Sequence, residues 1–326
     1  MKAAVVREPF GVDHLKIEEV EAPVAREGEV LVRVTRAGLN PVDVNVIRKK
    51  ILYNLKPVPH IPGSEAVGTV EEDSGSFKKG QRVIIYPRIF DGTCEMCLSG
   101  REYMCQNGGI FGVASNGGYC EMVSVPYRNV MPYSGEISED TASGLSVGAL
   151  TAYHALKRVR AEAHNSILVY GASGNTGIFA IQLAGIMGME VSAVSGKPWI
   201  SDYINGTLFD EYSKVSGTYD IVMNSLGAEH FKGSMEHVAP GGSLVTFGVL
   251  TGSATELDIG SVYTRERSVI GATGGTRKEL QEILGIMKNH EIRMPVEKTL
   301  PLEMIHYAFE LFQKRNSGRI LIKPSQ

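Results

Sequence analysis

One segment in the middle of the chain constrains the fold more than any other: residues 166–196, SILVYGASGNTGIFAIQLAGIMGMEVSAVSG. It reads as an apolar strand, a glycine-rich turn, a helix and a second apolar strand. Strands that are apolar throughout suit a parallel sheet buried on both faces. The segment therefore predicts one βαβ unit of a doubly wound parallel α/β sheet, a Rossmann-type domain.

The glycine-rich turn at residues 171–177 predicts a dinucleotide site. Gly174 allows the backbone to approach a pyrophosphate, and Gly177 permits close packing of the helix on the strand. The helix N-terminus supplies N–H groups and a partial positive charge for the phosphates. The alternative, a tight turn that binds nothing, is disfavoured because strand, helix and second strand all surround the turn. The predicted cofactor contacts in this turn are Ala172, Ser173, Gly174, Asn175, Thr176 and Gly177.

The end of the second strand bears on which nicotinamide cofactor is bound. An acidic residue there would bond the ribose 2′-hydroxyl of NAD, but this chain has Ser195 and Lys197. One unit charge at about 4 Å from a 2′-phosphate contributes on the order of 4 kcal/mol at an effective dielectric constant near 20. NADPH is therefore favoured over NADH, which stays possible. The alternative for Lys197 is a solvated loop lysine.

The length of the chain, 326 residues, indicates two domains, because one hydrophobic core rarely serves so many. Short β-branched segments bounded by Gly or Pro predict a small β domain up to about residue 130. Apolar periodicity predicts helices within 139–159, 277–290 and 304–315. Strands are expected at 3–6, 29–38, 66–72, 81–87, 121–126, 219–227, 241–249 and 318–324.

Composition excludes several classes of protein. A formal net charge of -3 gives no basic footprint for nucleic acid. No window approaches the roughly 20 apolar residues that a membrane span requires, and Arg7 and Glu8 interrupt any apolar signal region near the start. We therefore expect a cytoplasmic protein that acts on a small molecule.

Three of the four cysteines, Cys94, Cys97 and Cys105, fall within twelve residues, which favours metal binding over a disulfide framework. Their segment, DGTCEMCLSGREYMC at 91–105, resembles the structural-zinc lobe of the zinc alcohol dehydrogenases in the medium-chain dehydrogenase/reductase family. By that resemblance Asp91 stands where the lobe has its first cysteine, and a carboxylate is an acceptable zinc ligand. Metal-free thiols are the alternative. The alternative fourth ligand is Cys120, which is expected instead to pack as a small apolar residue.

The resemblance to this family covers nearly the whole chain, including the opening strand, the glycine turn and the motifs AGLNPVD (37–43), PGSEAVG (62–68), LTAYHAL (150–156) and GRILIKP (318–324). It implies a GroES-like, β-rich catalytic domain of residues 1–145 and 276–326, with a structural-zinc lobe at about 88–108. A Rossmann NAD(P)-binding domain of residues 146–275 is implied between them. One region departs from the family: between Gly196 and Asp220 the chain is short, so a strand or a helix is missing there.

The resemblance also indicates that the catalytic zinc is absent. Where zinc alcohol dehydrogenases have two cysteines and a histidine as ligands, this chain has Asn40, Ser64 and Val147. Glu65 remains, but one carboxylate does not make an open zinc site, which needs three protein ligands. His60 and His154 are interpreted as a loop and a helix-surface residue rather than as ligands.

The same motifs resemble the zinc-free quinone oxidoreductase branch of the family. That likeness implies that four residues surround the nicotinamide ring and the substrate: Asn40, Asp43, Tyr53 and Thr151. It also assigns Leu226, Gly248 and Arg319 to cofactor binding. Structural roles compete for two of them, since Asn40 with Pro41 can simply turn the chain and Tyr53 can be a core or interface aromatic.

The favoured function is an NADPH-dependent reductase of an activated double bond or a quinone. Tyr53, Asn40 or the nicotinamide ribose hydroxyl is expected to stabilise the developing negative charge or to pass a proton. Two alternatives stay open. One is a zinc alcohol dehydrogenase with unusual ligands, and the other is an NADPH-binding protein without turnover. The family implies a homodimer or homotetramer with one structural zinc ion per chain.

Overall fold

The computed structural model describes residues 1–50, 54–314 and 317–325, and these divide into two units. The first unit comprises Met1–Val147, Thr276–Leu284 and Met294–Gln326, and the second comprises Gly148–Gly275 and Gly285–Arg293. The division therefore falls two residues later than the sequence boundary at 145/146. It also places residues 285–293 in the second unit rather than in the predicted catalytic domain.

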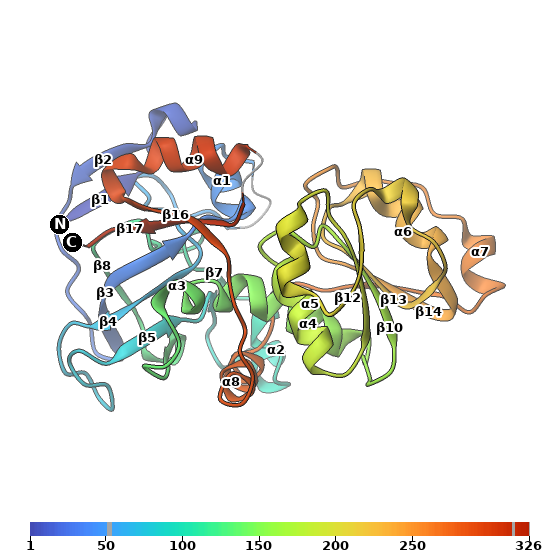
Figure 1. Ribbon diagram of the computed structural model, residues 1–326. Helices are drawn as coiled ribbons and strands as arrows, with labels where there is room; N and C mark the ends of the chain where they lie inside the picture. The colour runs from blue at the N-terminus through green and yellow to red at the C-terminus, as the bar shows by residue number, and fades with distance from the viewer. Residues whose placement is uncertain (51–53, 315–316, 326) are drawn as a thin grey trace. The chain divides into compact units, whose positions relative to one another are not determined.

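The first unit is built on a seven-stranded sheet, seen in Figure 1, in which six strands follow the order β16-β17-β3-β4-β5-β9 and β8 pairs with β3. Two small ribbons, β1-β2 and β6-β7, complete its strands. The bounds are β1 (Lys2–Val5), β2 (Lys16–Glu19), β3 (Glu29–Gly38), β4 (Ala66–Val70), β5 (Arg82–Ile85), β6 (Arg88–Ile89), β7 (Gly109–Ile110), β8 (Met122–Pro126), β9 (Val130–Pro132), β16 (Val296–Pro301) and β17 (Arg319–Lys323).

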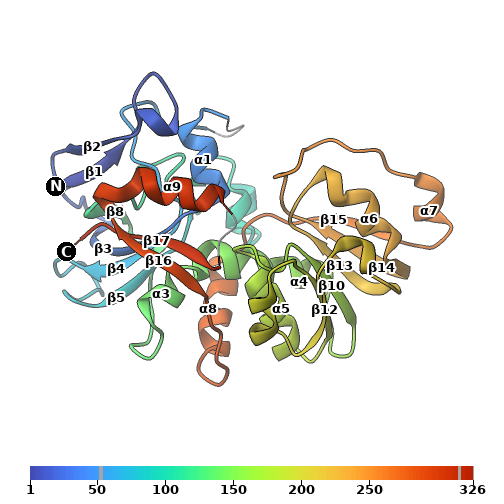
Figure 2. The same cartoon turned by 45° about the horizontal axis from the view of Figure 1, so that its top comes forward.

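The central strand of this sheet is β3, whose alternating apolar residues Val30, Val32 and Val34 are fully buried. Period-two burial of this kind is what a strand with one face on a core requires. The helix α9 lies along β16 and β17 (Figure 2) and adds its apolar face to the same core through Ile305 and Phe309. The helices of the first unit are α1 (Pro41–Ile47), α2 (Glu95–Leu98), α3 (Glu139–Ala142), α9 (Ile305–Gln313) and most of α8 (Arg277–Ile286).

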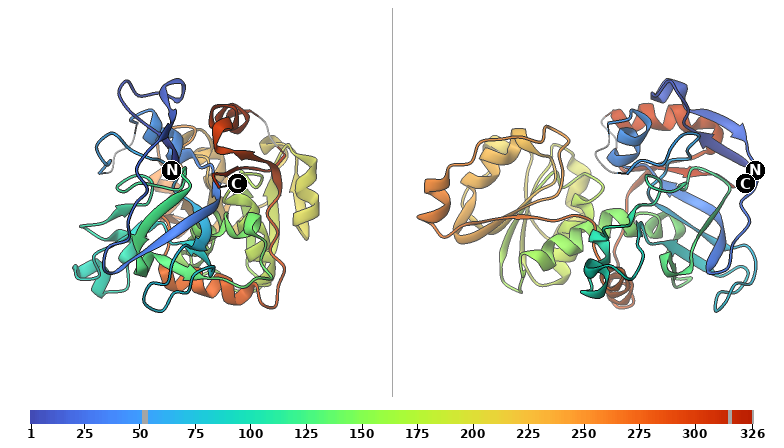
Figure 3. Two further views of the ribbon diagram at one scale, coloured as in Figure 1. Left: turned by 90° about the vertical axis from the view of Figure 1, so that its left-hand side faces the viewer. Right: turned by 180° about the vertical axis from the view of Figure 1, so that it is seen from behind.

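Segments from the two ends of the chain meet in the first unit (Figure 3). The backbone N–H of Lys2 donates to the Glu121 carboxylate, and the hydroxyl of Ser325 donates to the Glu121 carbonyl. The antiparallel pairing of β17 with the end of β3 brings Ile322 opposite Ala37. The first unit is thus completed by a strand that arrives almost three hundred residues after β3.

The second unit is a six-stranded parallel sheet in the order β12-β11-β10-β13-β14-β15, which confirms the predicted Rossmann-type fold. Its helices α4 and α5 lie side by side in Figures 1 and 2. The bounds are α4 (Leu150–Arg158), β10 (Ser166–Tyr170), α5 (Gly177–Ile186), β11 (Glu190–Val194), β12 (Gly206–Phe209), β13 (Tyr219–Asn224), α6 (Phe231–Glu236), β14 (Val238–Thr246), α7 (Ile259–Tyr263) and β15 (Ser268–Gly271).

The short segment between Gly196 and Asp220 keeps its strand and loses a helix. A 3₁₀ helix at Pro198–Tyr203 leads into β12, which pairs in parallel with β11. Between β12 and β13 the structure has only the 3₁₀ turn Tyr212–Lys214. The ring of Tyr212 stacks on Tyr170 with centroids 5.2 Å apart.

Among the residues that the structure describes, no helix is both long enough and apolar enough to cross a membrane.

Candidate active site, cofactor turn and metal cluster

The glycine turn follows β10 directly and leads into α5, as the sequence predicts. Gly171 has φ 72°, a left-handed conformation that glycine adopts without strain. A Cβ atom on Gly177 would lie 2.2 Å from the Gly171 carbonyl oxygen, so only glycine fits where the helix begins. The Gly174 N–H donates to the same carbonyl at 2.9 Å. This hydrogen bond closes the turn, and the first turn of α5 follows it directly.

The predicted cofactor residues of the second unit share one edge of its sheet. From β10 the strand order runs outward to β11 and β12 on one side and to β13, β14 and β15 on the other. Parallel sheets bind their ligands at the carboxyl ends of the strands at such a reversal. The residues that follow the four central strands there are 172–177 after β10, Ser195 and Lys197 after β11, Leu226 after β13 and Gly248 after β14.

The loops at this edge are held by hydrogen bonds. The Leu226 N–H donates to the Asn224 side chain at 2.9 Å, and the Thr251 N–H donates to the Leu226 carbonyl at 2.8 Å. The Lys197 N–H donates to the Ser195 hydroxyl at 3.2 Å, and the Lys197 ammonium lies 5.9 Å from the centre of the Trp199 ring. Ser195 itself is buried.

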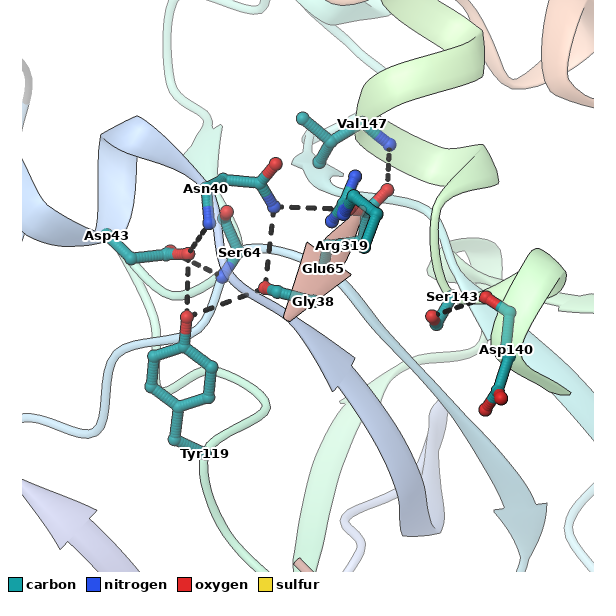
Figure 4. Close-up of polar contacts among 10 residues, drawn as sticks. All are labelled: Gly38, Asn40, Asp43, Ser64, Glu65, Tyr119, Asp140, Ser143, Val147 and Arg319. Carbon is teal, nitrogen blue, oxygen red and sulfur yellow. Dashed lines mark hydrogen bonds and ion pairs between the residues drawn. The ribbon is translucent and has the colours of Figure 1, made fainter. Parts of the chain in front are cut away.

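In the first unit a buried polar cluster lies where β3 passes into α1 (Figure 4). Asn40 is the residue before α1, and Pro41 begins the helix, where a missing N–H costs nothing. The fully buried Asp43 carboxylate accepts from the Asn40 N–H, the Ser64 N–H and the Tyr119 hydroxyl, each at 2.8 Å. These bonds tie α1, the loop before β4 and the segment before β8 to one carboxylate.

Burial raises the pKa of Asp43 from 3.8 to about 6, although the hydrogen bonds from Tyr119 and the Asn40 backbone act in the opposite direction. Burial also raises the pKa of Tyr119 well above 10, with the Asp43 charge as the next cause. The tyrosine therefore stays a neutral donor. Asp43 is a structural acceptor whose ionised form is costly.

A second carboxylate, Glu65, is surrounded by donors. Arg319 at the start of β17 approaches it to 2.6 Å, the Asn40 side-chain amide to 3.1 Å and the Val147 N–H to 2.6 Å. Both Glu65 and Arg319 are buried, with side chains 0% and 2% exposed. A Cβ atom on Gly38 would lie 2.2 Å from the guanidinium, so a glycine makes room for this ion pair.

The four predicted catalytic residues do not all lie in one unit of the described structure. Asn40 and Asp43 come together in the first unit, whereas Thr151 lies on α4 in the second. Tyr53 lies outside the described residues. Arg319, predicted to contact the cofactor, is the partner of Glu65, and its Nε and Nη1 atoms have no hydrogen-bond partner among the described residues.

The interpretation of His154 as a helix-surface residue is wrong, whereas His60 does lie in a loop. His60 is 1% exposed and bonds through Nε2 to the Gly112 carbonyl at 2.9 Å, and His154 is 5% exposed on α4. Burial lowers the pKa of His60 to about 4, so its ring is neutral at neutral pH. His154 is therefore buried rather than on a helix surface, and His60 is a buried loop residue joined to Val6 by an isolated bridge.

Tyr119 and Asn107 are site residues that sequence reasoning missed. Tyr119 is 76 residues from its partner Asp43, and no local pattern connects the two. Asn107 lies two residues after the last cysteine of the cluster, and its amide bonds the Asp91 carboxylate at 2.5 Å. The proximity of Asn107 to the lobe motif was the only signal for it in the sequence.

Replacing Asp43 with asparagine is expected to change how stability depends on pH. Because the folded pKa of about 6 exceeds the unfolded value of 3.8, the wild-type protein loses stability as pH rises through this window, by about 3 kcal/mol. The Asp43→Asn variant lacks this loss. Urea unfolding of both proteins at pH 4.5 and 7.5 measures it. His60 changes the stability with pH in the opposite direction, but it is present in both proteins, so the difference in unfolding free energy between variant and wild type reports on Asp43 alone. If that difference were the same at both pH values, the account would be contradicted.

The four predicted metal ligands come together in one cluster. One ligand atom from each of Asp91, Cys94, Cys97 and Cys105 lies within 4.8 Å of the others, and the Cys94 sulfur lies 3.6 Å and 3.8 Å from those of Cys97 and Cys105. A tetrahedral zinc ion with Zn–S bonds of about 2.3 Å places sulfurs about 3.8 Å apart. The cluster therefore fits a closed structural zinc site.

Asp91 is held in place by its own neighbours. Its Oδ1 accepts from the Thr93 and Cys94 N–H groups at 2.8 and 3.1 Å, and its carbonyl accepts from Arg128 at 2.6 Å. The Asn107 amide, followed by these backbone donors, holds the pKa of Asp91 well below its usual value. Cys120 is buried outside the cluster, as predicted, with its sulfur 3.2 Å from the Gly117 carbonyl.

Comparison with known proteins places both units in known families. Residues 26–135 match the family model described as alcohol dehydrogenase GroES-like domain, and residues 176–289 match that described as zinc-binding dehydrogenase. An NAD-dependent alcohol dehydrogenase of Sulfolobus acidocaldarius is 31% identical, with 99% of each chain covered. An acryloyl-coenzyme A reductase of Sulfurisphaera tokodaii is 28% identical, with 99% of this chain and 100% of the relative covered.

Among solved structures, a thermostable alcohol dehydrogenase from Pyrobaculum aerophilum is 34% identical over 99% of both chains, with a TM-score of 0.91. The identity and coverage are enough to establish common family membership. The chain belongs to the medium-chain dehydrogenase/reductase family and is a nicotinamide-dependent oxidoreductase.

Proposed function

We propose that the protein is an NADPH-dependent reductase of a double bond activated by a carbonyl group, or of a quinone, and that it works without a catalytic zinc ion. The observation that carries this proposal is that the Glu65 carboxylate is already hydrogen-bonded within the protein. The three positions of the catalytic zinc ligands hold Asn40, Ser64 and Val147, and the one remaining carboxylate is already engaged by Arg319, Asn40 and the Val147 N–H.

Zinc at this place would need three protein ligands and an open position. An amide, a hydroxyl and an aliphatic side chain are poor ligands for it. Withdrawing Glu65 from its partners would leave the Arg319 guanidinium buried without a counter-charge, which costs about 3–5 kcal/mol in comparable ion pairs. Deprotonation of an alcohol then lacks a Lewis acid. Reduction of an electrophilic carbon does not require one.

The chain's own residues would bind, orient and exclude water. When bound, the nicotinamide supplies the hydride. The turn at 171–177 and the first turn of α5 would hold the pyrophosphate, and Leu226 and Gly248 would border the cofactor at the ends of β13 and β14. Asn40 and Thr151, with Tyr53, would line the site of hydride transfer, and Asp43 would keep Asn40 in place through its backbone N–H.

NADPH is the cofactor that the end of β11 favours. Ser195 and Lys197 stand where NAD enzymes have an acidic residue, and both lie just beyond the strand. The buried Arg319 has two N–H-bearing nitrogens without described partners, and burying such donors unpaired costs about 1–3 kcal/mol each. A bound anionic group, such as a cofactor phosphate, would satisfy them.

The acryloyl-coenzyme A reductases among the relatives support an enoyl thioester as the first substrate to try, and the alcohol dehydrogenases among them support an alcohol as the competing candidate. The test is turnover of NADPH and of NADH with enoyl thioesters, enones and quinones, beside NAD⁺ with primary and secondary alcohols. We expect oxidation of NADPH with at least one electron-poor acceptor and formation of the saturated or hydroquinone product. Alcohol oxidation alone would refute the proposal.

Self-association as a homodimer or homotetramer is part of the same proposal. The edge strand β15 carries the exposed Val269, and apolar side chains are also exposed nearby in the chain at Val249, Leu250, Ile259 and Tyr263. Such a group of apolar side chains favours an interface between copies. Light scattering should give at least twice the mass of one chain, and a monomer at micromolar concentration would exclude it.

A further inference from the structure

Asn107 lies beside the metal cluster because of the small ribbon β6-β7. In this antiparallel ribbon Ile89 pairs with Gly109. The same register, continued by two residues beyond that pair, brings Asp91 opposite Asn107. Residues directly opposite each other in an antiparallel pair have Cβ atoms about 4.5–5.5 Å apart, so their side chains can meet. The Nδ2 atom of Asn107 accordingly lies 2.5 Å from Oδ2 of Asp91.

The contacts of the Asp91 carboxylate direct one of its oxygen atoms toward the cysteines. Oδ1 accepts from the N–H groups of Thr93 and Cys94 at 2.8 and 3.1 Å. A carboxylate has about four lone-pair sites, two on each oxygen. Because Asn107 occupies one site on Oδ2, the remaining site also belongs to Oδ2. The remaining contact of the carboxylate is with the Cys97 sulfur, which is itself a member of the cluster.

A carboxylate in this cluster needs such a restraint more than a thiolate would. A cysteine offers one sulfur atom, whereas an aspartate offers two oxygen atoms. Binding through both oxygens would add a fifth ligand to a site that structural zinc closes with four. Since two backbone N–H groups engage Oδ1 of Asp91, only Oδ2 is available, and the Asn107 amide fixes the direction in which Oδ2 points.

The backbone on both sides of this contact is held without the amide. The Asp91 carbonyl accepts from Arg128 at 2.6 Å, and the Asp91 N–H donates to the Cys105 sulfur at 3.4 Å. Beside Asn107, the Gly108 N–H donates to the Cys105 carbonyl at 3.4 Å. Removing the amide group is therefore expected to release the Asp91 side chain while the chain keeps its course.

We propose that Asn107 is a positioning residue of the metal site: its amide holds the Asp91 carboxylate so that Oδ2 alone serves as the fourth ligand beside the three cysteine sulfurs. Hydrogen bonds from residues behind the ligands orient those ligands and strengthen metal binding. A single oxygen from Asp91 keeps the number of ligands at four and leaves no open position. This inference concerns the structural ion and does not depend on the reaction that the protein catalyses.

The test is a double-mutant cycle on zinc affinity, measured by competition between the full-length protein and a chelator of known affinity. Asn107→Ala should weaken zinc binding by about 10–100-fold, because the carboxylate loses its orientation. Asp91→Cys supplies a fourth sulfur, which has no second oxygen to restrain. In the Asp91→Cys background, Asn107→Ala should therefore change zinc affinity by no more than about twofold.

Asn116→Ala is the matched control for this cycle. Asn116 is also an exposed amide of the first unit, and its Oδ1 accepts from the Ile61 N–H at 3.3 Å, outside the metal cluster. Its replacement should leave zinc affinity unchanged. An equal loss from Asn107→Ala with aspartate and with cysteine at position 91 would indicate a general packing role and overturn the proposal. Unchanged zinc affinity in Asn107→Ala alone would overturn it as well.

Cobalt spectroscopy keeps the proposal testable if Asp91→Cys does not fold. Co²⁺ bound in place of zinc gives sulfur-to-cobalt charge-transfer bands, which report on the thiolates, and ligand-field bands, which report on the whole ligand set. At saturating Co²⁺, the charge-transfer bands of Asn107→Ala should keep their intensity, because Cys94, Cys97 and Cys105 are unchanged. The ligand-field bands should shift, because the oxygen ligand is reoriented or replaced by water. Ligand-field bands identical to those of the wild type would overturn the proposal.

Discussion

Replacing Cys105 with serine is expected to abolish binding of the structural zinc ion and to unfold the lobe that contains it. Neither the helix α2 nor the 3₁₀ helix Glu102–Met104 contains a buried residue. The lobe therefore has no apolar core of its own, and the cluster of three sulfurs and one carboxylate is what holds its two halves together. Structural zinc sites contribute roughly 10 kcal/mol or more at neutral pH.

The measurement is zinc content per chain by elemental analysis, with proteolysis of residues 91–108 as the structural readout. Wild type should hold one tightly bound ion, and Cys105→Ser less than about a tenth of one. The control is Cys120→Ser: that side chain is buried outside the cluster, and a hydroxyl can keep its contacts to the Gly117 and Met122 carbonyls. Full zinc retention by Cys105→Ser would show that the cluster is not the metal site.

Replacing Gly177 with valine is expected to destroy both cofactor binding and the stability of the second unit. A Cβ atom there would lie 2.2 Å from the Gly171 carbonyl oxygen and 2.7 Å from the Ala172 Cα, and these are backbone atoms that cannot turn aside. Either α5 moves away from β10 or the turn opens. Damage of this kind belongs among the largest single-residue effects, above about 4 kcal/mol.

Two other glycines separate folding from binding in this experiment. Among the described atoms, a Cβ atom on Gly174 would meet only the Gly171 carbonyl oxygen, at 3.2 Å, so Gly174→Ala should fold. It should nevertheless lose NADPH affinity by about tenfold, because the methyl group stands where the pyrophosphate is expected to approach. A Cβ atom on Gly185, inside α5, would meet no described atom of a neighbouring element within 4 Å, and Gly185→Ala should stabilise the helix by about 0.5–1 kcal/mol. Urea unfolding and NADPH fluorescence titration read the two effects. Normal NADPH affinity in Gly177→Val would contradict this account of the turn.

Local patterns account for what the sequence predicted well. The strand, turn and helix at 166–186 are contiguous, so their apolar periodicity and glycines were readable directly, and the spacing of Cys94, Cys97 and Cys105 brought the ligands together as expected. The bounds of β3 were also predicted, because its apolar residues alternate over ten positions. In each case the decisive contacts lie close in sequence.

Long-range contacts account for what it missed. The bond from Tyr119 to Asp43 spans 76 residues, and the ion pair from Arg319 to Glu65 spans 254. Neither has a signature in its own segment, because both depend on how β17 and the segment before β8 return to the end of β3. The helix missing between β12 and β13 was anticipated as a deletion but not located.

The account rests on hydride transfer that proceeds without zinc beside the reacting groups. Anomalous diffraction across the zinc edge, from crystals of the NADPH complex grown with zinc, tests this most directly. It should show one ion per chain, between Asp91, Cys94, Cys97 and Cys105, and no peak within bonding distance of Asn40, Ser64 or Glu65. A second ion bound by Glu65 would contradict the account and would indicate an alcohol dehydrogenase that uses zinc in catalysis.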